Sequence, residues 1–150
     1  MKIHVIYGTV GGNTKLVCES AADVWVSAGH EVKFFDVKAP DAEASVDGDI
    51  LVFASPTYGH GELEPHFEKF LHELGNIDLK NKKCAVVGLG DPKYDKDYHL
   101  ESIKIISDFL GEKDAVVLHM PLRISKNPLP LIEQNFVKRW AEKILEALKQ

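Results

Sequence analysis

The sequence has little of what marks several large classes of protein. Its two cysteines, Cys18 and Cys84, lie in apolar runs without CxxC spacing, which favours reduced core thiols over a disulfide framework or a zinc site. No apolar run approaches the ~18 residues of a membrane span, and no signal peptide is apparent. Acidic residues outnumber lysine and arginine by 23 to 18, so no nucleic-acid footprint is expected. We therefore expect a single cytoplasmic domain over residues 1–150 that binds neither nucleic acid nor membrane.

Strand-like and helix-like patterns alternate along the chain. Five short, mostly apolar runs predict strands, at 3–7, 32–34, 49–54, 84–89 and 115–120. Apolar residues at helical spacing lie between these runs, and we expect helices to stop at Gly29, Gly75 and Gly111. A last helical stripe covers 137–148. Strands that alternate with helices predict an α/β fold, in which helices cover both faces of a parallel sheet.

Ligands of such sheets bind outside the carboxyl ends of the strands, so the loops after the first, third and fourth strands are the informative ones. The first loop is glycine-rich and runs into a helix, with Thr9, Val10, Gly11, Gly12, Asn13 and Thr14. Backbone N–H groups at a helix N-terminus suit an anion, and both threonines could donate hydrogen bonds to a phosphate. The alternative is a tight turn in which Asn13 or Thr14 caps the helix.

The other two loops each offer a tyrosine at the same edge of the sheet. The second loop contains Pro56, Thr57, Tyr58, Gly59, His60 and Gly61. The third contains Leu89, Gly90, Asp91, Tyr94 and Tyr98. A planar, phosphate-bearing ligand held between two rings fits this arrangement, although a surface turn with a packed Tyr58 is the alternative for the second loop. The aspartates of the third loop lack EF-hand spacing, so no metal site is expected.

Taken together, these motifs resemble those of the short-chain flavodoxins, over essentially the whole chain. The family's phosphate loop, Ser/Thr-x-Ser/Thr-Gly-x-Thr, is matched by Thr9, Gly12 and Thr14, whereas Gly11 replaces a hydroxyl. A Gly-Gly pair at this place is similar to MioC-type flavodoxin-like proteins and to the FMN modules of diflavin reductases. The resemblance implies a three-layer α/β/α sandwich whose five-stranded parallel sheet has the order 2-1-3-4-5. No insertion of the long-chain kind is expected in the fifth strand.

The tyrosines extend the resemblance to the cofactor. Tyr58 matches the aromatic residue that covers one face of the flavin, and Tyr94 matches the tyrosine that stacks on the other. The family's Gly-Asp-Ser-Ser-Tyr motif is altered here, because Pro92 and Lys93 replace the two serines. The resemblance implies non-covalently bound FMN, contacted by residues of all three loops: Thr9, Val10, Gly11, Gly12, Asn13, Thr14, Pro56, Thr57, Tyr58, Gly59, His60, Gly61, Leu89, Gly90, Asp91, Tyr94 and Tyr98.

The same resemblance implies a low-potential one-electron carrier, without catalytic residues or a substrate of its own. It would pass electrons from a NAD(P)H-dependent flavoprotein reductase to redox acceptor proteins, and a monomer is expected. Six acids against two lysines fall near the expected FMN edge: Glu62, Glu64, Asp91, Asp95, Asp97 and Glu101, with Lys93 and Lys96. An acidic rim of this kind would steer a basic partner surface into a transient complex. A generic solvated acidic face is the alternative.

Three other functions are compatible with this fold class. A response-regulator receiver needs an acidic phosphoacceptor after the third strand, where this chain has Ser55 and Pro56, so fold alone does not support that function. A flavin-dependent quinone or azo reductase would oxidise NADPH without a partner. A MioC-type accessory protein, or a module of a larger reductase, is the third alternative. A yellow preparation that contains FMN would favour the carrier over the receiver.

Overall fold

The computed structural model describes residues 1–8, 12–39, 41–58, 62–90, 101–124 and 127–149. The strands are β1 (Lys2–Tyr7), β2 (Glu31–Asp36), β3 (Ile50–Tyr58), β4 (Glu62–Leu63), β5 (Lys83–Leu89), β6 (Val116–Val117) and β7 (Leu122–Ile124). The helices are α1 (Asn13–Ser27), α2 (Ala42–Ser45), α3 (Pro65–Leu74), α4 (Glu101–Glu112), α5 (Pro128–Glu133) and α6 (Phe136–Ala147). The element order confirms the predicted alternation of strands and helices.

The sheet has the strand order β2-β1-β3-β5-β6, and these neighbours pair in parallel. This is the predicted 2-1-3-4-5 order, since β4 is a short strand that pairs antiparallel with β3 beside the main ladder. The prediction of a continuous fifth strand over 115–120 is wrong. Two short segments, β6 and β7, instead pair with opposite ends of β5. Leu118 N–H still donates to Cys84 O at 2.9 Å. The chain leaves the ladder after it, and Pro121 has no N–H to contribute.

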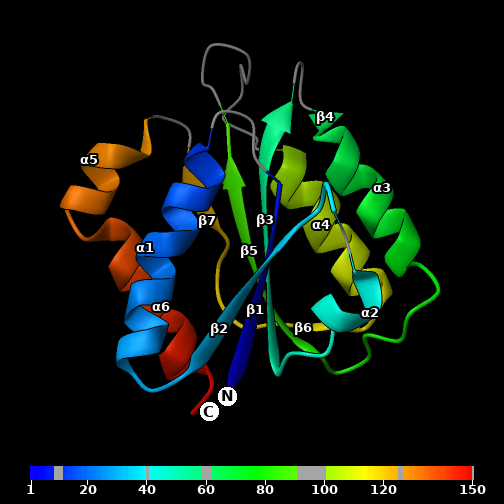
Figure 1. Cartoon of the computed structure of the whole chain (residues 1–150), viewed down its shortest axis with the longest axis horizontal. Coiled ribbons are helices and arrows are strands. Elements are labelled where there is room, and N and C mark those ends of the chain that lie inside the picture. Colours follow the sequence, from blue (N-terminus) through cyan, green and yellow to red (C-terminus); the bar gives the residue numbers. More distant parts are fainter. Residues whose placement is uncertain (9–11, 40, 59–61, 91–100, 125–126, 150) are drawn as a thin grey trace.

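Helices cover both faces of the sheet, as predicted (Figure 1). In that view α1, α5 and α6 lie on one side of the strands and α2, α3 and α4 on the other. Alternate residues of β3 pack into the cores on opposite faces of the sheet. Ile50, Val52 and Ala54 belong to one core cluster. Leu51 and Phe53 belong to the other. Because both faces are buried, the strand has an unbroken apolar sequence.

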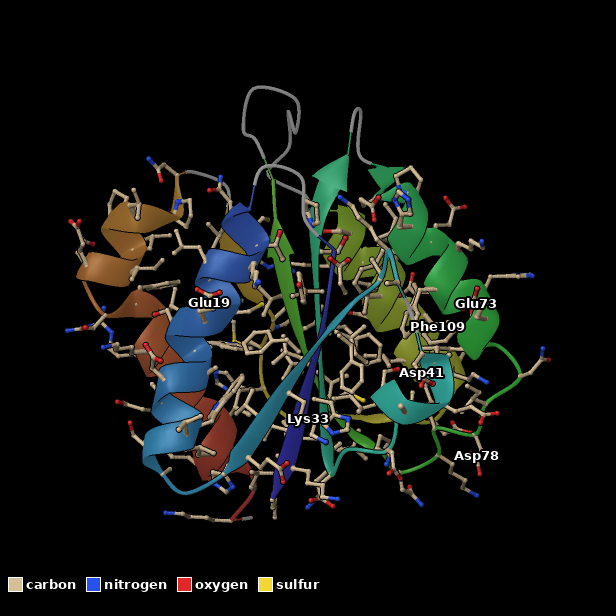
Figure 2. All side chains as sticks on the ribbon, in the orientation of Figure 1. Glu19, Lys33, Asp41, Glu73, Asp78 and Phe109 are labelled. Carbon is tan, nitrogen blue, oxygen red and sulfur yellow. The ribbon has the colours of Figure 1, made fainter. Side chains whose placement is uncertain are left out.

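Glu19, Glu73 and Asp78 are exposed on the outer surfaces of helices and loops, as Figure 2 shows. The apolar side chains fill the two spaces between the sheet and its helices. Within the described ranges, no helix has both the length and the apolar character that a membrane crossing requires. The predicted stop at Gly111 is off by one residue, since α4 ends at Glu112.

The two cysteines are free, buried thiols on opposite faces of the sheet. Cys18 packs in the cluster beneath α1 and α6, and Cys84 packs in the cluster beneath α3 and α4. The sheet lies between them, so the predicted absence of a disulfide between them follows from the fold. Burial raises the pKa of each thiol to about 12, which leaves almost no reactive thiolate at neutral pH.

We expect neither thiol to react with a thiol-specific reagent in the native protein at pH 8. Both should react at once in urea, because unfolding returns their pKa values to the ordinary range. The measurement is a colorimetric thiol titration with and without denaturant. One equivalent of rapid reaction in the native state would contradict the buried placement of Cys18 or Cys84.

Candidate functional site

The strand order places a switch point between β1 and β3. The sheet extends through β2 on one side of β1 and through β3 and β5 on the other, and α1 and α3 lie on opposite faces (Figure 1). A crevice for a ligand is expected outside the carboxyl ends of strands at such a point. The register pairs Tyr7 with Ala54 and Pro56 with Leu89. The three loops predicted to bind the cofactor therefore leave the sheet side by side.

The N-terminus of α1 has features that favour binding of an anion. Its N-cap is Gly12, which has a left-handed backbone with φ of 87°, and no described side chain caps the helix. The alternative in which Asn13 or Thr14 caps the helix is therefore wrong. The first turn carries no acidic residue, so the positive end of the helix dipole is not neutralised there by a carboxylate. The first N–H groups of a helix have no intrahelical partner, and they suit a bound phosphate.

Thr14 supplies the most specific observation at this site. Its side chain is 1% exposed, and its Oγ1 has no hydrogen-bond partner among the described residues. A buried hydroxyl without a partner costs about 1–3 kcal/mol, so native proteins rarely leave one in place. The hydroxyl lies in the first turn of α1, where a phosphate would also meet the N–H groups. The described residues of this loop therefore fit the phosphate of FMN.

A second cluster joins the loop after β3 to α4. Thr57 Oγ1 lies 3.1 Å from Ser102 Oγ, and Ser102 is fully buried at the start of α4. This bond fixes the strand just before its hairpin with β4, in which Thr57 pairs with Leu63 and Tyr58 with Glu62. Because Ser102 already engages the Thr57 hydroxyl, we expect Thr57 to position the loop as well as to contact a ligand. No sequence motif indicated a role for Ser102.

Glu64 does not belong to the exposed acidic rim in which the sequence analysis placed it. The residue is 3% exposed, and it caps α3 by accepting hydrogen bonds from the backbone N–H groups of His66 and Phe67, at 3.1 and 3.0 Å. His66 Nδ1 lies 2.7 Å from the same carboxylate. A glutamate directly before Pro65, the first residue of the helix, is a sequence signal that could have identified this cap.

Burial works to raise the pKa of Glu64, but the hydrogen bonds from His66 and Phe67 outweigh it and hold that pKa below its ordinary value of 4.5. A carboxyl whose pKa falls on folding stabilises the protein above the unfolded pKa, and this contribution disappears as the pH falls through the folded pKa. Loss of the cap should cost about 1–2 kcal/mol.

We therefore expect Glu64→Gln to lower the free energy of unfolding by about 1–2 kcal/mol at pH 7. The gap between variant and wild type should narrow as the pH falls from about 4.5 downward, where the wild-type carboxyl protonates. Urea unfolding at pH 7, 5 and 4 measures both effects. The matched control is Glu73→Gln, an exposed acid of the same helix, which should change stability by less than about 0.5 kcal/mol. Equal losses at all three pH values would contradict the role of the charged carboxylate.

Several predicted site residues lie outside the described part of the chain, and their roles stay predictions: Thr9, Val10, Gly11, Gly59, His60, Gly61, Asp91, Tyr94 and Tyr98. The same holds for the side chain of Tyr58 and for most of the acidic rim. Of the predicted contacts that are described, Leu89 buries its side chain in the core cluster beneath α1 and α6. The backbone N–H of Gly90 donates to Ile124 O at 2.9 Å. Leu89 could therefore meet a ligand mainly through its backbone.

Sequence and structure comparisons with known proteins all match this chain to flavodoxins. The sequence model described as flavodoxin matches residues 5–140. A flavodoxin of Maridesulfovibrio salexigens is 29% identical over 150 residues, covering 98% of this chain and 99% of the relative. A probable flavodoxin 2 of Bacillus subtilis is 27% identical and covers 95% of each chain. The crystal structure of oxidised flavodoxin 2 from Bacillus cereus superposes with a TM-score of 0.88 at 30% identity, covering 97% of this chain and 99% of that one.

Proposed function

Because the chain belongs to the flavodoxin family, whose members bind FMN and carry electrons, we propose a specific place for it in electron transfer. It accepts electrons one at a time from a NAD(P)H-dependent flavoprotein reductase and delivers them at low potential to redox acceptor proteins. Residues 1–150 act as a single FMN-binding domain of a monomeric, cytoplasmic carrier. The observation that best supports FMN binding is the buried Thr14 hydroxyl at the start of α1, which has no partner among the described residues.

The chain's own residues bind and orient the cofactor. Thr14 would donate a hydrogen bond from its hydroxyl to the phosphate, beside the first N–H groups of α1. Thr57 is held to α4 through Ser102, and Tyr58, the next residue, is proposed to cover one face of the flavin ring. Tyr94 is proposed to cover the other face. Bound FMN supplies the one-electron chemistry, and the protein holds the ring where a partner can reach its edge.

Partner docking is proposed at the acidic FMN edge. Without Glu64, the rim consists of Glu62, Asp91, Asp95, Asp97 and Glu101, with Lys93 and Lys96 among them. A net charge of −5 supports steering of a basic partner surface, because complementary fields raise association rates more than they raise affinity. Such complexes should dissociate more readily as salt screens the charges.

The test has two arms that separate a carrier from an enzyme. Flavin released by denaturing the purified protein should co-elute with FMN rather than FAD. The FMN-loaded protein should then stimulate cytochrome c reduction by NADPH only when a flavodoxin reductase is present. Steady NADPH oxidation by the protein alone would instead support a quinone or azo reductase, and the absence of any stimulation would overturn the proposed shuttle.

A further inference from the structure

A pocket of about 500 Å³ opens beside the β6–β7 edge of the sheet. It lies between the segment that joins β6 to β7 and the helix α6. Its apolar walls include Met120, Phe136 and Trp140, of which Met120 is 73% and Phe136 41% exposed. Trp140 Nε1 donates a 2.9 Å hydrogen bond to Met120 O. This bond fixes the segment to the helix, so the pocket is preformed.

The charge of this pocket is opposite to that of the whole chain. Arg123, Arg139 and Lys143 line it, and none of the described residues that line it is acidic, although the chain carries a net charge of −5. Within the described part of the chain, Arg123 and Arg139 have no ion-pair partner. Lys143 has only an exposed pair with Glu146, which contributes little. Two arginines without carboxylate partners can each bind a carboxylate in a bidentate fork.

The pocket also adjoins an open edge of the sheet. β6 and β7 pair with β5 on their inner side, and no described strand lies on their outer side. Val116 and Val117 of β6 are 45% and 39% exposed. An edge with free backbone groups and exposed apolar side chains can accept an added strand. The open sheet edge, the apolar pocket walls and the basic side chains therefore form one surface along residues 116–123 and α6.

We propose that this surface, formed by Val116–Arg123 together with Phe136, Arg139, Trp140 and Lys143, docks an extended acidic segment of a partner protein. Carboxylates of the segment pair with Arg123 and Arg139, and its apolar side chains lie over Trp140, Phe136 and Met120. The segment adds to the sheet edge, as in strand addition to other open sheets.

The surface runs along the β6–β7 edge, and only its β7 end adjoins the predicted flavin site. β7 pairs with the carboxyl end of β5, from which the third predicted cofactor loop leaves, whereas β6 pairs with the opposite end of β5. The proposed flavin rim is acidic and repels such a segment, whereas this surface attracts it.

The test is a titration of the full-length, FMN-loaded, ¹⁵N-labelled protein with a capped octapeptide in which glutamate alternates with leucine, phenylalanine and valine. We expect saturable shifts at Val117, Met120, Arg123 and the Trp140 indole N–H, with a dissociation constant below about 1 mM. The variant with Arg123→Gln and Arg139→Gln should weaken binding roughly tenfold. The matched control, Lys33→Gln with Lys38→Gln, removes the same charge from two exposed residues in and just after β2, the strand at the opposite edge of the sheet, and should bind as the wild type does.

A peptide with lysine in place of glutamate should not bind. Equal binding of that peptide, shifts confined to other residues, wild-type affinity in the double arginine variant, or no saturable binding would each overturn the proposal. Shifts at these residues that depend on protein concentration without peptide would identify a second copy of the chain as the occupant, and they would likewise overturn it. FMN content and reductase-driven activity are measured separately, so neither result depends on the other.

Discussion

Replacing Thr14 with valine should weaken FMN binding by roughly 10- to 150-fold while leaving riboflavin binding nearly unchanged. The hydroxyl is buried and has no partner among the described residues, and a hydrogen bond to a charged group contributes about 1.5–3 kcal/mol. Riboflavin has no phosphate, so it gains nothing from this donor. Valine keeps the branched shape of threonine and fills the same space without a donor. Fluorescence quenching of each flavin by the apoprotein measures both affinities.

The same variant should make the apoprotein more stable. A buried hydroxyl without a partner destabilises the fold, so its replacement by a methyl group should add about 1 kcal/mol to the free energy of unfolding. Thr14→Ser retains the donor and is the matched control, with FMN affinity close to that of the wild type. Equal losses of FMN and riboflavin affinity in Thr14→Val would show that the hydroxyl does not serve the phosphate.

The parts of the fold that sequence could predict are those in which a local pattern coincides with burial. The run Ile50–Ala54 is apolar throughout because both faces of β3 are covered, and the α6 stripe recurs at the helical period. The short elements escaped prediction because two to four residues carry no period. The break between β6 and β7 was missed for a different reason. Its apolar residues look like a strand, but Trp140 binds the carbonyl of Met120 away from the ladder.

The candidate site likewise has features that follow from local sequence and features that depend on long-range packing. The glycine-rich loop indicated a phosphate because the need for N–H groups at a helix start is local in sequence. Composition alone placed Glu64 on the rim, whereas its burial depends on a helix that begins at the next residue. Ser102 could not be identified, since its bond to Thr57 joins positions 45 residues apart. Long-range partners of this kind follow from the packing of α4 on the sheet.

Replacing Gly88 with alanine should lower the free energy of unfolding by about 3 kcal/mol and the midpoint of thermal unfolding by about 6–12 °C. A Cβ at Gly88 would overlap Ile103 Cγ1 and lie 2.7 Å from its Cδ1. The overlap is hard to relieve from either side. Gly88 lies in a central strand, and Ile103 is a buried, β-branched residue of α4 whose side chain has few alternative rotamers. The added atom therefore displaces the helix, and calorimetry or thermal circular dichroism measures the loss.

A glycine-to-alanine exchange within α4 should change stability in the opposite direction. Gly111 has nothing within 4 Å of its would-be Cβ, so Gly111→Ala should stabilise the protein by about 0.5–1 kcal/mol through helix propensity. The double variant with Gly88→Ala and Ile103→Ala should lose less stability than the sum of its single variants, because the clash and the cavity compensate. Displacement of α4 also moves Ser102 away from Thr57, so FMN affinity should fall with Gly88→Ala and stay unchanged with Gly111→Ala. Additive losses in the double variant would show that Ile103 is not what excludes a side chain at Gly88.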